Sequence, residues 1–348
     1  MNVINNNKGI DLNQYDNYLS IDWSQDKVAI ARMRRNSAEP KVIEMDPPEL
    51  KKVRKYLSEI RGRKILTIEE TTSTHWLYVG LKETVDRILI CDPYVNKLLQ
   101  TGAQTDKLDA RDLCKLLRAN MLREVYHSME EDYIIRKLAS NYEDLVKMGV
   151  RIKNQKSALF RAEGLNHKKD ELPEQAILKF IEQKQNGIIE IYERDKEDYQ
   201  EYFKKIISHS PQIKNLLKIP GIGEVFAVTI YAIVIQADRF PDKYRYWAYC
   251  GLALNRKESG KRQYGKRKPR CSRKLRGIYI SASRSAIGGH NDLAEYYNHL
   301  IESGTPEKVA RKSIARYIAK VSLGMLKTKE QYVPYKWRNS KVKEEEVN

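Results

Sequence analysis

The first 120 residues of this 348-residue chain alternate between short apolar runs and helical patterns. Residues 18–22 and 28–33 read as two strands joined by a turn, and residues 41–44 read as a third strand. The next elements are expected at residues 47–61 (helix), 64–70 (strand), 74–83 (helix), 85–91 (strand) and 106–119 (helix). Because strands and helices alternate, they must pack in layers, so this order predicts an α/β fold.

Acidic residues fall at the ends of these elements. Asp22 ends the first strand, and the adjacent Glu69 and Glu70 end a later one. Asp106 and Asp109 begin the last helix, where their spacing places them about 60° apart on one face. Helix capping, with Asp106 as N-cap, is the alternative explanation for this pair alone. Carboxylates gathered beyond the carboxyl ends of strands are ligands that Mg²⁺ prefers, so a metal site is predicted.

This order of elements and acids resembles the ribonuclease H-like fold of the RuvC resolvases. The resemblance implies two Mg²⁺ ions, about 4 Å apart, that clamp the attacking and leaving oxygens of a phosphodiester. Adjacent residues on a strand point to opposite faces, so only one of Glu69 and Glu70 can reach the metals.

The positive charge of the chain is concentrated in one stretch. The net charge is +18, and residues 256–276 contain eleven Lys or Arg and one acid, Glu258. Charge this dense predicts binding to the phosphates of nucleic acid, with a steep salt dependence. A membrane surface is the alternative partner, but no apolar stretch is long enough to span a bilayer, so no membrane protein is expected.

The remaining segments read as mainly helical. Apolar side chains keep helical spacing within residues 134–152 and 192–206, which predicts a long antiparallel hairpin or coiled coil that favours self-association. Residues 219–223, written Ile-Pro-Gly-Ile-Gly, precede an apolar helix expected at residues 224–237. This pattern is typical of a helix-hairpin-helix element, in which Gly221 and Gly223 free backbone N–H groups for a phosphate; a plain turn is the alternative.

The four cysteines and the N-terminus indicate in which cellular compartment the protein is expected. The cysteines are scattered without a CxxC pair, which argues against a zinc site or a disulfide framework and favours a reducing cytoplasm. The polar N-terminus lacks the apolar core of a signal peptide. A cytoplasmic location is therefore expected.

Several motifs, in order, resemble the DEDD transposases of the insertion-sequence "one-ten" group, the bridge-RNA-guided recombinases. The N-terminal motifs are Ser20-Ile21-Asp22, Glu70-Thr71-Thr72 and residues 105–111, TDKLDAR. The C-terminal motifs are residues 219–223, Tyr249-Cys250-Gly251-Leu252, Glu258-Ser259-Gly260-Lys261 and residues 272–276. The resemblance covers about residues 17–330.

The resemblance implies roles for individual residues. Asp22, Glu70, Asp106 and Asp109 would be the metal ligands, and Ser259 the nucleophile. Glu70 is chosen over Glu69 because Trp76 then lies six residues further on, where the family has an aromatic residue. The residues expected to contact nucleic acid are Gly221, Gly223, Lys261, Arg262, Lys266, Arg267, Lys268, Arg270, Arg273 and Lys274.

The resemblance also implies an assembly and a domain order. A prokaryotic, nucleoid-associated dimer or tetramer would bind donor DNA, target DNA and a structured guide RNA, and the RuvC-like domain of one subunit would complete the site of another. The expected parts are a disordered N-terminus (1–16), a RuvC-like domain (17–125), a coiled-coil region (126–212), a mainly α transposase domain (213–330) and a disordered tail (331–348).

The predicted function is therefore Mg²⁺-dependent, RNA-guided DNA recombination through a covalent serine–DNA link. One alternative is a RuvC-like nuclease that hydrolyses DNA junctions with water, where Ser259 belongs only to a Ser-Gly turn. Another is a non-enzymatic nucleic-acid binder with decayed acids, which the intact acid set argues against.

Overall fold

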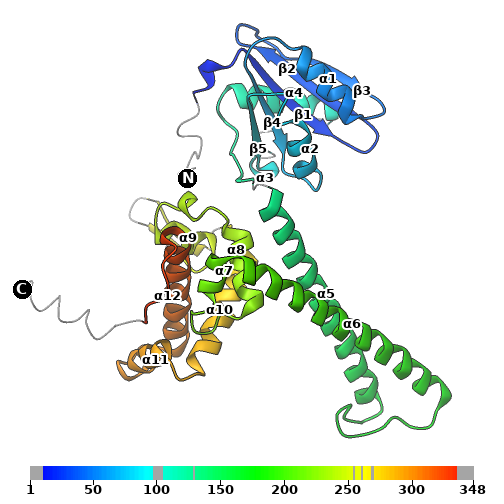
Figure 1. Cartoon of the computed structure of the whole chain (residues 1–348), viewed down its shortest axis with the longest axis vertical. Coiled ribbons are helices and arrows are strands. Elements are labelled where there is room, and N and C mark those ends of the chain that lie inside the picture. The colour runs from blue at the N-terminus through cyan, green and yellow to red at the C-terminus, as the bar shows by residue number, and fades with distance from the viewer. Residues whose placement is uncertain are drawn as a thin grey trace, which may run out of the picture. The chain divides into compact units, whose positions relative to one another are not determined.

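The computed structural model describes residues 11–96, 105–127, 130–253, 255–259, 262–267 and 270–334. The chain divides into two compact units, one ending at His127 and the other starting at Ser128. Their elements are labelled in Figure 1, and each unit is treated by itself. In the part of the chain that is described, no helix is both long enough and apolar enough to cross a membrane.

The N-terminal unit contains a mixed five-stranded sheet of order β3-β2-β1-β4-β5. β1 (Asn17–Trp23) pairs antiparallel with β2 (Val28–Arg34), which pairs antiparallel with β3 (Lys41–Met45). On its other side β1 pairs parallel with β4 (Lys64–Glu69), which pairs parallel with β5 (Arg87–Cys91). The α/β prediction is confirmed, and the strands lie within two residues of their expected bounds.

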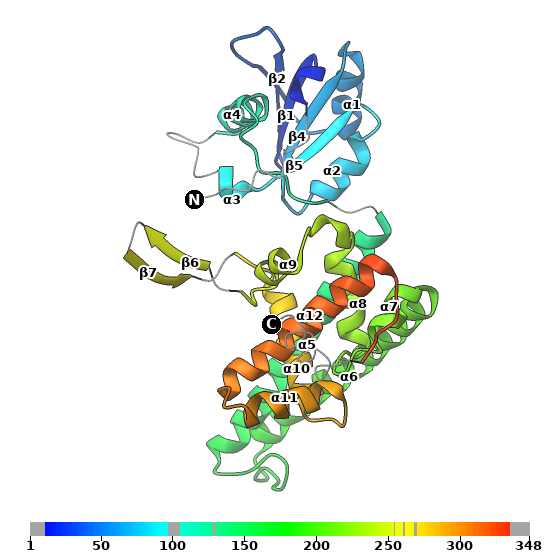
Figure 2. The same cartoon turned by 90° about the vertical axis from the view of Figure 1, so that its left-hand side faces the viewer.

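Helices cover both faces of this sheet (Figure 2). α4 (Asp106–Arg118) packs on one face, over a core that includes Tyr18. α1 (Leu50–Glu59) and α2 (Thr74–Leu81) cover the other face, over a core that includes Leu19. Alternate residues of β1 therefore face opposite layers, and Asp22 falls on the α4 side. The short elements η1 (Leu12–Gln14) and α3 (Pro93–Asn96) complete the described part of this unit.

The expectation of disorder for residues 1–16 is wrong for residues 11–16. Tyr15 is buried, and its ring lies under the guanidinium of Arg63. The Asp16 carboxylate accepts a hydrogen bond of 2.9 Å from the Arg63 backbone N–H. The polar composition concealed these anchors, which only tertiary contacts supply. Residues 1–10 lie outside the described residues.

The second unit begins with the predicted helical hairpin, formed by α5 (Glu130–Ala162) and α6 (Ala176–His209). The helices are antiparallel, because Lys153 pairs with Glu193 whereas the later Lys156 pairs with the earlier Glu182. Gly149 permits a close approach: a Cβ there would lie 2.3 Å from the Tyr192 ring.

Part of the predicted apolar stripe of α5 is not buried. Ile134 and Met148 are 61% and 67% exposed, whereas Ala139 and Tyr142 are buried. The prediction took the contact face from the periodicity of large apolar residues. The real contact face also uses small ones, alanine and glycine, which allow the helices to approach.

Compact helices fill the rest of the unit and share one hydrophobic core with the base of the hairpin. They are α7 (Pro211–Leu216), α8 (Glu224–Val234), η2 (Ala237–Arg239), α9 (Lys243–Tyr249), α10 (Arg273–Ile287), α11 (Asp292–Glu302) and α12 (Glu307–Thr328). A buried chain of hydroxyls joins three of them: Tyr246 to Tyr279 at 2.5 Å and Tyr279 to Ser322 at 2.7 Å. α9, α10 and α12 are thereby tied together.

One element of this unit was not predicted. β6 (Asn255–Ser259) and β7 (Arg262–Arg267) form an antiparallel hairpin inside the basic stretch. The density of Lys and Arg concealed the strands in the sequence. The expectation of a disordered tail also fails at its start, because the Tyr332 hydroxyl donates to Asp292.

Candidate active site

Three of the predicted metal ligands lie between β1 and α4. The Ser20 hydroxyl donates to the Ala110 carbonyl of α4 at 2.5 Å, which fixes this strand against this helix. Asp22 follows two residues later on the same face of β1. Asp106 and Asp109 occupy the first turn of α4, whose N-cap is Thr105 rather than Asp106. The capping alternative for Asp106 is therefore wrong, and its carboxylate is left for other contacts.

The other carboxylates act electrostatically on Asp22. Asp22 is half-buried, and its pKa is raised from 3.8 to about 6. Burial is the largest cause, followed by the negative charges of Asp106, Asp109 and Glu69. Carboxylates from two other segments, β4 and α4, are thus close enough to Asp22 to disfavour its ionisation.

The glutamate of this cluster is Glu69. Ile21 pairs with Ile68 in parallel register, so Asp22 and Glu69 follow side by side on neighbouring strands. The Glu70 backbone N–H donates to the Cys91 carbonyl at 3.0 Å, so strand pairing continues and the Glu70 side chain alternates to the other face. Glu70 is exposed, whereas Glu69 is half-buried. The arrangement thus differs from the prediction of Glu70 as the ligand, because the family motif does not record which face a side chain takes.

A lysine that the sequence reasoning missed accompanies the acids. The Lys27 ammonium lies 3.3 Å from the Asp106 carboxylate and 3.6 Å from that of Glu44. The turn before β2 holds it there, because the Ser24 hydroxyl donates to the Lys27 carbonyl at 2.7 Å. One signal in the sequence could have indicated this contact: Lys27 follows Asp22, the acid at the end of the strand, after one tight turn.

The donor set suits a divalent cation. Among the described residues, no group of three or more His, Cys, Asp or Glu side chains converges closely enough to hold a metal ion as the protein stands. Carboxylate oxygens are nevertheless the ligands that hard cations prefer. The raised pKa of Asp22 indicates that the negative charge of the cluster is only partly compensated, even with Lys27 beside Asp106.

Asp22→Asn should stabilise the metal-free protein at neutral pH. The folded pKa of Asp22, about 6, exceeds its ordinary 3.8, so the ionised carboxylate costs stability above pH 6. That cost falls as the pH drops through 6 and is absent below about pH 4. We expect a Tm higher by roughly 2–4 °C at pH 8 in EDTA and equal to the wild type at pH 4, measured by circular dichroism.

The matched control for this measurement is Asp26→Asn in the exposed turn nearby, which removes the same charge outside the cluster. An equal gain in both variants, or a gain independent of pH, would contradict the electrostatic origin of the effect.

The predicted nucleophile ends β6. Ser259 pairs with Arg262 at the end of the β6–β7 hairpin, and further along Arg256 pairs with Lys266 and Asn255 with Arg267. The predicted contacts Lys261 and Lys268 lie outside the described residues. The hairpin therefore places Ser259 beside the basic residues that the sequence predicted as phosphate contacts.

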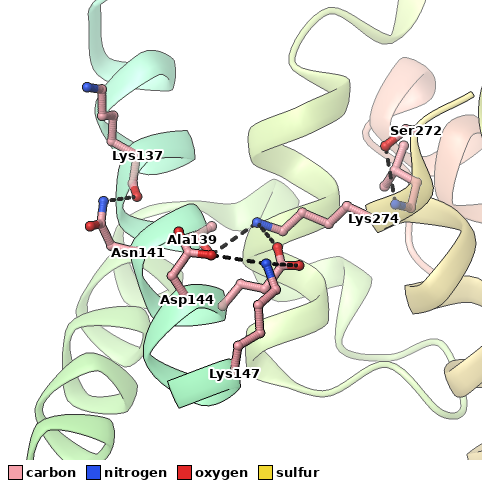
Figure 3. A network of polar contacts seen from close by, with 9 residues as sticks. Lys137, Ala139, Asn141, Asp144, Lys147, Ser272 and Lys274 are labelled. Carbon is pink, nitrogen blue, oxygen red and sulfur yellow. Dashed lines mark hydrogen bonds and ion pairs between the residues drawn. The ribbon is translucent and has the colours of Figure 1, made fainter. Parts of the chain in front are cut away.

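The predicted nucleic-acid contacts after β7 separate into two kinds. Arg270 and Arg273 are exposed. The Lys274 ammonium instead donates to the Ala139 carbonyl at 3.1 Å and pairs with Glu143 at 3.0 Å, which joins α10 to α5 (Figure 3). Lys274 thus packs α10 against α5 in the protein by itself, and its role as a phosphate contact stays a prediction.

The two glycines of the predicted phosphate-binding turn also differ. Gly221 has φ +83°, and a Cβ there would lie 2.1 Å from the Ala282 carbonyl oxygen of α10. Close packing on α10 therefore explains this glycine. Gly223 is exposed at the N-cap of α8, and open space surrounds its Cβ position.

The fold and site together define a class of protein. An α/β unit with a mixed sheet carries clustered carboxylates, which is compatible with a ribonuclease H-like domain, and a mainly helical unit carries a basic hairpin. Residues 19–162 match a transposase model of the DEDD type of IS110 elements, and residues 213–298 match the model described as "Transposase IS116/IS110/IS902 family". The two matches cover about two thirds of the chain, which belongs to this transposase family.

A relative supports the assignment over a shorter region. The "insertion element IS116 uncharacterized 44.8 kDa protein" of Streptomyces clavuligerus is 28% identical over 117 residues. The matched region is 33% of this chain and 29% of the relative's own length.

Proposed function

We propose that the chain is a transposase that cleaves and rejoins DNA through a covalent link to Ser259, guided by a structured RNA. The observation that carries the proposal is the coincidence of two features in one family member. Burial and a cluster of neighbouring carboxylates raise the pKa of Asp22 to about 6, and a basic hairpin bears a serine.

The proposed metal ligands are Asp22, Glu69, Asp106 and Asp109, with Glu69 in place of the Glu70 of the motif. Two Mg²⁺ ions bound there would lower the pKa of an attacking hydroxyl and stabilise the leaving oxygen. Lys27, held 3.3 Å from Asp106, offsets part of the negative charge of the cluster before metal binds. The four carboxylates would hold these cations, which the DNA phosphate requires because carboxylates and phosphate by themselves repel one another.

Ser259 supplies the nucleophile in this proposal. Its oxygen bonds to phosphorus, one bridging phosphorus–oxygen bond of the DNA breaks, and the departing nucleotide oxygen takes up the proton. The link conserves the energy of the phosphodiester, so attack by a second DNA hydroxyl rejoins strands without a co-reactant. Neighbouring cations such as Arg262 favour the negative charge that develops on the phosphate.

Self-association is part of the proposal. α5 has 33 residues, so its hairpin extends roughly 50 Å and can carry one active-site half toward another subunit. Apolar side chains are exposed along α6, including Ile177 at 75% and Phe180 at 58%. We propose that such faces join copies of the chain into a dimer or tetramer.

The second candidate is a junction nuclease that uses water, and the carboxylate cluster taken alone favours it. A denaturing gel of labelled DNA after incubation with protein and Mg²⁺ separates the two. The proposal predicts cleaved DNA attached to protein and released by protease, whereas the nuclease leaves only free ends.

Replacing Lys266, Arg267 and Lys268 with alanine should weaken binding to DNA or guide RNA by a similar factor for all sequences. Each lost phosphate contact lowers counterion release, so the slope of log K against log salt should become shallower by up to about 3. Filter binding at several salt concentrations measures it. An unchanged slope would show that these three side chains face solvent and do not contact phosphates.

A further inference from the structure

A cavity of about 300 Å³ lies between α10 and α12 in the second unit. Five cationic side chains line it: Arg276, Arg284, Lys308, Arg311 and Lys312. No acidic residue is among its lining residues. Four of these cations lie outside the basic stretch of residues 256–276, so the cavity is a separate concentration of positive charge.

The two helices present these cations from facing sides. Arg276, Ile280 and Arg284 recur at intervals of four on α10, and Lys308 and Lys312 do the same on α12, so each set lies on one helical face. Arg311 also pairs with the carboxylate of Glu307, which is not among the residues that line the cavity. Five cations around one cavity create a positive potential that attracts an anion.

The cavity is built at the root of the β6–β7 hairpin. Gly251 lines it with φ +65°, and a Cβ there would lie 3.0 Å from Cδ of Arg276 and 2.7 Å from Sγ of Cys271. Glycine therefore lets the stem of Arg276 lie against the backbone that leads into β6. The Ser272 N–H donates to the Tyr249 carbonyl at 2.8 Å, which joins the segments that enter and leave the hairpin.

We propose that this cavity binds the phosphodiester backbone of a nucleic-acid strand, at the root of the hairpin that carries Ser259. Arginine and lysine on the two walls match the charge of phosphate oxygens, and Leu252 and Ile280 offer apolar surface to the sugars. Contacts to the backbone do not read the base sequence. They fix the position and orientation of the strand in the cavity. The inference rests on the proposed function and adds a binding site to it.

The test neutralises three exposed cations of the cavity while keeping their stems, as Arg276→Gln/Arg284→Gln/Lys308→Gln in the full-length protein. The matched control, Lys168→Gln/Lys169→Gln/Lys204→Gln, removes the same charge from exposed positions on the α5–α6 hairpin. Fluorescence anisotropy in EDTA, at several salt concentrations, uses a 30-base-pair DNA duplex and an RNA duplex of the same sequence. Circular dichroism verifies that both proteins are folded.

The cavity variant should bind at least tenfold more weakly at 50 mM salt, with a salt slope shallower by about 2–3, whereas the control keeps the wild-type slope. A loss of affinity for only the DNA duplex or only the RNA duplex supports the proposal and identifies which nucleic acid the cavity binds. Equal losses in variant and control, or no loss with either duplex, overturn it. The anisotropy assay measures binding without cleavage. A negative result therefore rejects the cavity as a binding site but does not bear on the covalent chemistry, which the denaturing gel tests separately.

Discussion

Replacing Ser259 with alanine should abolish the covalent protein–DNA adduct, with a loss on the order of 10⁴-fold or more in its rate of formation. The substitution removes one hydroxyl oxygen and keeps the backbone pairing of Ser259 with Arg262. DNA binding should therefore be unchanged. Labelled DNA on a denaturing gel measures the adduct, and anisotropy measures binding.

Ser272→Ala is the matched control, because it removes a serine hydroxyl from the same basic region. The Ser272 hydroxyl accepts a hydrogen bond from the Leu275 N–H as the N-cap of α10. Its loss should cost about 1 kcal/mol of stability and leave the adduct intact. An adduct that persists in Ser259→Ala would disprove the nucleophile assignment, and its disappearance in Ser272→Ala would transfer that assignment to Ser272.

Mixing the Ser259→Ala and Asp106→Asn proteins tests whether subunits share active sites. If one subunit's acids act with another's serine, the mixed oligomer contains some sites with both halves intact, and adduct formation should partly recover. Two inactive proteins that assemble together and remain inactive would show that each subunit uses its own acids.

Asp106→Asn or Asp109→Asn should remove DNA cleavage, by at least about 10³-fold at low Mg²⁺, while the fold persists. A lost ligand charge weakens binding of the cation, and it also relieves the repulsion felt by Asp22. The stability of the metal-free protein should therefore hold or rise slightly. Cleavage assays across a Mg²⁺ titration, with Tm in EDTA, measure both effects. Full cleavage activity of either variant at low Mg²⁺ would disprove the assignment of Asp106 and Asp109 as metal ligands.

Glu69→Gln and Glu70→Gln form a matched pair within this test. Glu69 acts on Asp22 electrostatically, whereas Glu70 is exposed beyond the end of β4. We expect Glu69→Gln to behave like Asp106→Asn and Glu70→Gln to retain cleavage. The reverse result would restore the assignment that the family motif favours.

Local patterns in the sequence predicted much of the fold. Short apolar runs located the five strands of the sheet, and β1, β2, β4 and β5 each bury consecutive residues of their runs. The spacing of Asp106 and Asp109 predicted their shared helical face, and the structure adds that Thr105 is the cap. These features depend on neighbours a few residues apart, which a sequence records directly.

Features that depend on distant segments were beyond local patterns. Glu69 joins the cluster because β4 pairs with β1 in one particular register, which Ile21 and Ile68 establish. The ion pair of Lys274 was not predicted, because its partner, Glu143, lies on a helix more than a hundred residues away. The cavity between α10 and α12 arises from the packing of two helices that are each unremarkable as sequence.

The β6–β7 hairpin has a consequence for the fidelity of the reaction. In the described residues its sheet has two strands, and two-stranded sheets are only marginally stable in water by themselves. Its root, in contrast, rests on helices fastened by the hydroxyls of Tyr246, Tyr279 and Ser322. On the proposed function, part of the energy of binding DNA would then be spent on holding the strand that ends at Ser259 in place. A DNA that binds more weakly would hold the proposed nucleophile less firmly, and its cleavage would be slower.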